Sequence, residues 1–141
     1  MAERPRMRLG AGESWLELAR TGGDEWRVTA DWCSSLTADC DAFLTDGEAV
    51  DFAVRMFSHL SSPTAFAAAV TEGRNNPLRL RGAPVEDGFA LFAFLTPNGD
   101  DAVCHLQTEI GPIGTEDPRE HFEAFHASLT ARRRDGAATR E

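Results

Sequence analysis

The chain has 141 residues, of which 42% are hydrophobic, and its formal net charge at pH 7 is −9. This length suits one domain with one core. No apolar run approaches the roughly 20 residues that span a bilayer, so we expect a cytoplasmic protein without a membrane segment. Residues 9–131 contain 20 acidic residues against 7 arginines. This excess of negative charge opposes nucleic-acid binding, which depends on cationic contacts to phosphates.

The N-terminal part of the chain predicts a short arm followed by three strands. We expect the charged residues 1–12 to form a flexible arm, although Met7 and Leu9 could extend a first strand. Residues 15–20 then read as a strand. Hydrophobic and polar side chains alternate along residues 26–32 and 36–42, which is the pattern of strands with one buried face. The short connections between these strands favour an antiparallel meander.

A capping box marks the start of the first helix. The Thr45 hydroxyl can accept a hydrogen bond from the backbone N–H of Glu48, and the Glu48 carboxylate can accept one from the backbone N–H of Thr45. Residues 49–61 follow with apolar side chains at helical spacing, which predicts a core-facing stripe. The stripe consists of Val50, Ala53, Val54, Phe57 and Leu60. Residues 65–72 then predict a short second helical segment, or a strand around residues 68–70, so the conformation of residues 62–76 stays open.

The C-terminal half repeats the pattern of strands followed by a helix. Residues 78–81, 89–95 and 102–110 predict strands, and the middle one is apolar on both faces, which is typical of a central strand. A final helix should begin with Asp117 as its N-cap and Pro118 as its first residue and continue to about residue 134. Residues 135–141 predict a disordered tail. The predicted common core consists of Phe57, Leu91, Phe94, Leu106, Phe122 and Phe125.

These elements predict an α+β fold in a single domain over residues 13–134. The order βββα(α)βββα favours a mostly antiparallel, curved sheet of about six strands with two helices packed on it.

Acidic residues gather where the third predicted strand leads into the first helix. On the strands they alternate with apolar residues, so their carboxylates should lie on the solvent side. They could hold a hard cation or act as a general acid and base, but we favour a solvated surface that meets a basic partner. The predicted partner-binding residues are Asp31, Asp39, Asp41, Asp46, Glu48 and Asp51.

Three tryptophans, Trp15, Trp26 and Trp32, predict a possible ligand crevice between sheet and helix. The alternative is that they belong to the core, which we favour because Trp26 and Trp32 share the inward face of one predicted strand.

The sequence predicts no catalytic residue, metal ligand or cofactor. Cys104 and His105 are adjacent in one strand and point to opposite faces, so they cannot share a metal. Cys33 and Cys40 lack the paired spacing of zinc sites, and three cysteines without CxxC spacing predict free thiols in a reducing compartment. No phosphate-binding or nucleophile motif occurs.

Read as a whole, the chain resembles a family of small uncharacterised actinobacterial proteins with a domain of unknown function. The matching segments are the strand pair at residues 26–42, the helix DGEAVDFAVRMFSHL, the hairpin NPLRLRGAPVEDGFALFAFL and the closing HLQTEIGPIGTEDPREHFEAFHASL. The resemblance implies no activity. In architecture and acidity the chain is similar, more distantly, to bacterial immunity proteins that neutralise toxins.

Two functions from different classes follow. The first is a non-enzymatic protein-binding domain, for example an immunity protein whose acidic face meets a basic toxin. The second is a small-molecule-binding protein or enzyme that uses the aromatic crevice. The identity of a partner and the oligomeric state are left open by the sequence.

Overall fold

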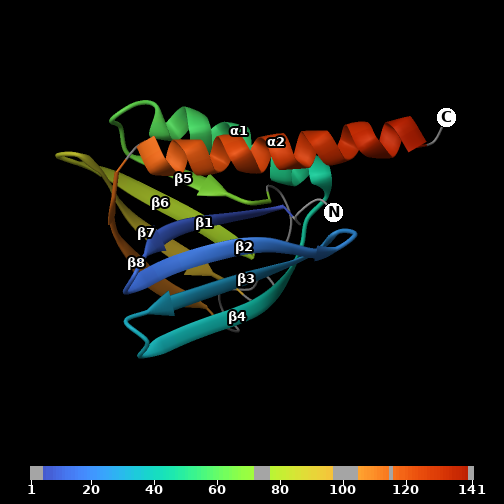
Figure 1. The fold of residues 1–141 in the computed structure, drawn as a ribbon. Helices are drawn as coiled ribbons and strands as arrows, with labels where there is room; N and C mark the ends of the chain where they lie inside the picture. Colours follow the sequence, from blue (N-terminus) through green and yellow to red (C-terminus); the bar gives the residue numbers. More distant parts are fainter. Residues whose placement is uncertain (1–4, 72–76, 97–104, 115, 140–141) are drawn as a thin grey trace.

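The computed structural model describes residues 5–71, 77–96, 105–114 and 116–139, and it is an α+β fold with two four-stranded antiparallel sheets and two helices (Figure 1). We call the sheet β1-β2-β3-β4 sheet A and the sheet β5-β6-β7-β8 sheet B. The elements are β1 (Arg6–Ala11), β2 (Ser14–Gly22), β3 (Glu25–Trp32), β4 (Leu36–Phe43), α1 (Asp46–Leu60), β5 (Phe66–Ala69), β6 (Leu78–Val85), β7 (Gly88–Leu95), β8 (Leu106–Ile113) and α2 (Glu116–Thr139).

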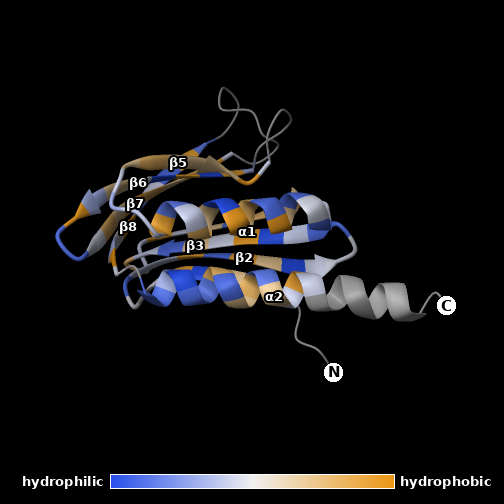
Figure 2. Ribbon diagram, turned by 90° about the horizontal axis from the view of Figure 1, so that it is seen from above, coloured by the Kyte–Doolittle hydropathy of each residue, from blue (hydrophilic) through white to orange (hydrophobic). Residues whose placement is uncertain are grey.

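The α+β class is confirmed, but the prediction of one sheet of about six strands is wrong. Each sheet is a simple meander, because every strand pairs with its neighbour in sequence. The helix α1 connects the two meanders, and α1 and α2 lie side by side (Figure 2). No helix in the described part of the chain is both long and apolar enough to cross a membrane.

Residues 6–11 form a strand, so the prediction of a flexible arm is wrong for them. Met7 and Leu9 are each only 1% exposed, and they alternate with the exposed Arg6 and Arg8. Met7 pairs with Leu18 and Leu9 with Leu16 across the β1–β2 ladder. Two buried side chains and a ladder of backbone hydrogen bonds offset the entropy lost when this short segment is ordered.

Residues 66–69 form β5, so the strand alternative is correct and the second helical segment is wrong. The alanines favour a helix by propensity, but the burial of Phe66 and Ala68 against the exposure of Ala67 follows the two-residue period of a strand. Phe66 lies opposite Gly82 in the β5–β6 ladder, and a Cβ at position 82 would overlap the Phe66 ring. Glycine at position 82 therefore makes room for the Phe66 ring.

The capping box of α1 is confirmed, with Glu48 N to Thr45 Oγ1 at 3.1 Å and Thr45 N to Glu48 Oε1 at 2.9 Å. The predicted stripe is partly wrong, because Val54 is 51% exposed and Phe57 is half-buried, whereas Phe52 is fully buried. The observed stripe has the same helical spacing but is rotated about the helix axis. It consists of Ala49, Phe52, Ala53, Met56 and Leu60.

The helix α2 begins at Glu116, so Asp117 lies in its first turn and is not its N-cap. It also continues to Thr139, which makes the prediction of a disordered tail wrong for residues 135–139. Its Phe122 ring contacts Phe52 at a centroid distance of 5.8 Å, and its Phe125 ring contacts Trp26 at 5.8 Å, both edge to face. The second helix is therefore joined to α1 and to sheet A through aromatic contacts.

In the central strand β7, Phe94 does not point into the core. Phe89, Leu91, Ala93 and Leu95 are buried, while Phe94 is half-buried on the outer face. The prediction of core membership is confirmed for Leu91, Phe122 and Phe125, and Leu106 is partly buried against the core. It is wrong for Phe57 and Phe94. A strand that is apolar on both faces does not reveal which face is inward.

We predict that Phe52→Ala lowers the free energy of unfolding by about 3 to 5 kcal/mol, because it leaves a cavity in the core. The matched change Phe57→Ala should cost about 1 to 2 kcal/mol, since the Phe57 ring is only half-buried. Urea unfolding of both variants measures the difference. An equal or larger loss for Phe57→Ala would contradict the observed orientation of α1.

Candidate functional site

The predicted acidic residues of the strands lie together on the outer face of sheet A. In the β3–β4 register Arg27 lies opposite Asp41 and Thr29 opposite Asp39. Arg27 Nε donates a hydrogen bond to Asp39 Oδ1, and Arg27 Nη1 donates one to Asp41 Oδ1 at 2.6 Å. The hydrogen bond that Arg27 donates to Asp39, the charge of Asp39 and the charge of Asp41 raise the pKa of Arg27 above its ordinary value, so this guanidinium is charged at every physiological pH.

These two carboxylates remain largely in solvent despite the ion pairs. The side chains of Asp39 and Asp41 are 56% and 72% exposed. Phe43 follows on the same outer face of β4, opposite Glu25, and is itself 61% exposed. We call this surface the acidic face, and it consists of Glu25, Arg27, Asp31, Asp39, Asp41 and Phe43.

The three predicted acidic residues of the helix have other local partners. Asp46 forms an ion pair at 2.7 Å with Arg20, whose side chain is only 5% exposed. Glu48 completes the capping box, and Asp51 forms an ion pair at 2.8 Å with Arg55 one helical turn away. These carboxylates stabilise the start of α1 and its surroundings. The predicted set of six therefore divides into the acidic face and a structural group on α1.

The three tryptophans do not line one crevice, so that prediction is wrong. Trp26 is buried in the core at 1% exposure, and Trp32 is 45% exposed at the end of β3. Trp15 lies on the outer face of sheet A, where the Arg8 guanidinium is 4.2 Å from its ring centroid. Strand alternation separates Trp15 from Trp26, because side chains at odd and even positions along these paired strands point to opposite faces.

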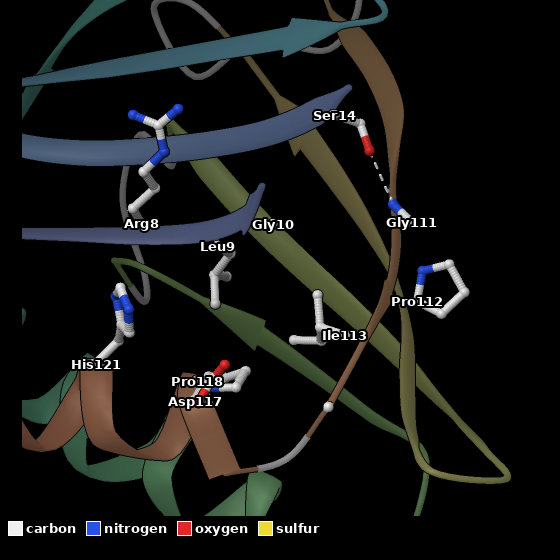
Figure 3. A pocket seen from close by; sticks show the side chains of 11 residues that line it. Arg8, Leu9, Gly10, Ser14, Gly111, Pro112, Ile113, Asp117, Pro118 and His121 are labelled. Carbon is white, nitrogen blue, oxygen red and sulfur yellow. Dashed lines mark hydrogen bonds between the residues drawn. The ribbon is translucent and has the colours of Figure 1, made fainter. Parts of the chain in front are cut away.

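One hollow lies where the β1–β2 hairpin, β8 and the first turns of α2 meet (Figure 3). Its volume is about 340 Å³, and its polar lining includes Ser14, Asp117 and His121. Ser14 Oγ accepts a hydrogen bond from the backbone N–H of Gly111 at 3.0 Å, which ties sheet A to β8. We call this hollow the hairpin cleft.

The hairpin cleft holds residue types that occur in hydrolases, but their arrangement does not form a catalytic relay. Ser14 and His121 lie at opposite ends of the cleft (Figure 3). Neither Asp117 nor His121 makes a side-chain hydrogen bond with any part of the chain that the structure describes. A nucleophile needs a base within hydrogen-bond reach. The Ser14 contact is better explained as a link between the two sheets.

A second hollow lies on the outer face of sheet B beside α1. Its volume is about 390 Å³, and among the described residues every charged side chain that lines it is an arginine. We call it the arginine groove, and its lining includes Arg55, Ala67, Ala69, Arg79, Arg81 and Phe94. Sequence reasoning missed this site. The alternation of leucine and arginine at residues 78–81 was the available signal, because it places two guanidinium groups on one face of a strand.

The comparisons with known proteins give no further guide to these sites: no family model, no curated protein and no solved structure matches the chain. Among residues 5–71, 77–96, 105–114 and 116–139, no group of three or more His, Cys, Asp and Glu side chains could hold a metal ion. Cys104 lies outside the described residues.

We predict that Gly10→Ala destabilises the protein far more than Gly12→Ala. Both residues have positive φ, +80° and +68°, so a side chain costs about 1 to 2 kcal/mol at either position. Only at Gly10 would the new Cβ overlap the Ser14 carbonyl oxygen and lie 2.6 Å from Ile110 Cγ2, which adds about 1 to 3 kcal/mol. Urea unfolding measures both. Equal losses would show that β8 does not lie against the hairpin.

Proposed function

We propose that this protein is a non-enzymatic binding domain that meets a basic protein partner through the acidic face. The observation that carries the proposal is the exposure of Phe43 beside two solvent-facing carboxylates on β4. An exposed aromatic ring within a polar surface is the kind of group that anchors a protein interface.

The charges of the acidic face favour a cationic partner. The acidic face as defined holds four carboxylates, on Glu25, Asp31, Asp39 and Asp41, and one cation, Arg27. Arg27 also fixes the positions of two of the carboxylates, so less conformational entropy is lost when a partner binds them. Attraction between this face and a basic surface accelerates association and weakens as salt screens it.

The position of β4 makes the acidic face accessible. It is the last strand of sheet A, and Figure 1 shows it on the side of the sheet away from both helices. Charged side chains on an edge strand also prevent pairing with other strands, so the acidic residues have a second use that does not require a partner. This second use does not account for the exposure of Phe43 on the same strand.

A toxin-neutralising role is the specific form of this proposal. It is supported by the charge of the acidic face and by the resemblance in architecture and acidity to immunity proteins. A small-molecule function through the tryptophans has lost its structural basis, because Trp15, Trp26 and Trp32 lie apart.

We predict that Asp39→Asn/Asp41→Asn slows association with a synthetic oligoarginine peptide by about tenfold at low salt. The control Glu86→Gln/Asp87→Asn removes the same charge from the exposed turn between β6 and β7. Surface plasmon resonance measures the rates, and thermal unfolding of both variants should stay close to that of the wild type, because exposed ion pairs contribute little. If both variants slow association equally, net charge and not the acidic face attracts the peptide.

We further predict that Phe43→Ala leaves the association rate almost unchanged and accelerates dissociation of an oligoarginine peptide that carries a tryptophan. Loss of an aromatic contact acts on the dissociation rate, while charge acts on the association rate. Val85→Ala is the control, since Val85 is also exposed and lies on β6 of sheet B. An unchanged dissociation rate for Phe43→Ala would show that Phe43 is not an anchor.

A further inference from the structure

We propose that the arginine groove is a binding site for a small organic anion that carries a phosphate group on an aromatic or apolar body. The groove is separate from the acidic face, because it lies on sheet B and the acidic face lies on sheet A. Its volume of about 390 Å³ is within the range of small-molecule sites.

The groove is a local concentration of positive charge on a chain whose net charge is −9. Arg55 comes from α1, while Arg79 and Arg81 come from β6. Arg79 and Arg81 are two positions apart on one strand, so both side chains project from the same face about 6 to 7 Å apart. The planar guanidinium group of arginine matches the oxygens of a phosphate and can donate two hydrogen bonds to it.

Arg55 is held in a defined position at one side of the groove. Its Nε donates to Asp51 Oδ2 at 2.8 Å, and its Nη2 donates to the backbone carbonyl of Ala69 at 2.8 Å. Its side chain is only 24% exposed. A guanidinium that is already oriented loses little further freedom when an anion binds.

Small side chains make the space between the arginines. Ala67 lies opposite Arg81 and Ala69 lies opposite Arg79 in the β5–β6 register. These alanines share the outer face with both arginines, and their methyl groups leave a hollow where larger side chains would fill the surface. The register therefore explains why a groove forms here.

Phe94 supplies an apolar surface beside the positive charge. It lies opposite Arg79 in the β6–β7 ladder, with the Arg79 guanidinium carbon 5.8 Å from the ring centroid. The ring is half-buried, so part of it faces the groove. A ligand with both a phosphate and an aromatic ring can contact the guanidinium groups and Phe94 together. This combination favours an aryl or nucleoside phosphate over inorganic phosphate.

The nearest described carboxylates do not fill the groove. Asp51 is already paired with Arg55 at the side of the groove. Glu109 lies opposite Phe92 on β8, which is two strands away from β6, and it is not part of the groove lining. Among the described residues, the charged side chains that line the groove are all arginines.

The direct test is a titration of the ¹⁵N-labelled protein with phenyl phosphate, followed by two-dimensional NMR. Phenol and inorganic phosphate serve as separate probes of the ring and of the anion. We expect saturable shifts of the Ala67, Ala69 and Phe94 amides with phenyl phosphate, and weaker binding of either half alone. No saturable shift, or shifts centred on the hairpin cleft, would overturn the proposal.

Matched variants separate the groove from general charge. Arg79→Gln/Arg81→Gln should weaken phenyl phosphate binding by about tenfold or more, whereas Arg6→Gln/Arg8→Gln removes the same charge from β1 and should leave it unchanged. Amide spectra check that each variant is folded, and Arg81→Gln alone serves if the double variant is not. Equal weakening by both pairs would contradict the proposal. Concentration-dependent self-association that is lost only in Arg79→Gln/Arg81→Gln would also overturn it, because a second copy would then occupy the groove.

Discussion

The aromatic contacts of α2 are the constraint on which the rest of the structure depends. Phe125 packs against Trp26 of β3, and three residues earlier Phe122 packs against Phe52 of α1. Because α2 follows β8 after only two residues, the position of α2 also determines where β8 lies. Gly10 then allows β8 to approach the β1–β2 hairpin closely, and the Ser14 to Gly111 hydrogen bond joins the two at that point. Two meanders that pair only within themselves therefore share one hydrophobic core.

This arrangement determines which surfaces remain available for function. The inner faces of both sheets contribute to the shared core, so most charged side chains of the strands lie on the outer faces. The outer face of β3 and β4 carries the carboxylates around Arg27, while the outer face of β5 and β6 carries the arginine groove. The acidic face and the arginine groove thus lie on different sheets. We infer that the two surfaces serve ligands of opposite charge, a basic protein on one and a small anion on the other.

Features that depend on neighbouring residues could be predicted from the sequence, and features that depend on distant ones could not. The capping box at Thr45 is a local contact between side chains and backbone, and the alternation along β3 and β4 correctly placed Asp39 and Asp41 outside. Arg27 follows the same alternation and could have been recognised as their partner. In contrast, Phe52 and Phe57 both fit helical spacing, and the packing of α1 against distant elements, including Phe122 on Phe52, decides which one is buried. The arginine groove depends on β5 lying between α1 and β6, which the helix propensity of its alanines concealed.

The central claim is that both sheets belong to one cooperative unit, and urea unfolding followed by two probes tests it most directly. All three tryptophans lie in β2 and β3, so their fluorescence reports on sheet A and, through Trp26, on its contact with α2. The backbone amide signals of Leu80 and Leu91 report on sheet B in the same titration. If α2 and β8 join the sheets through one core, the two probes give the same midpoint and the same dependence on urea. Loss of the tryptophan signal at a urea concentration where Leu80 and Leu91 keep their native signals would contradict this account.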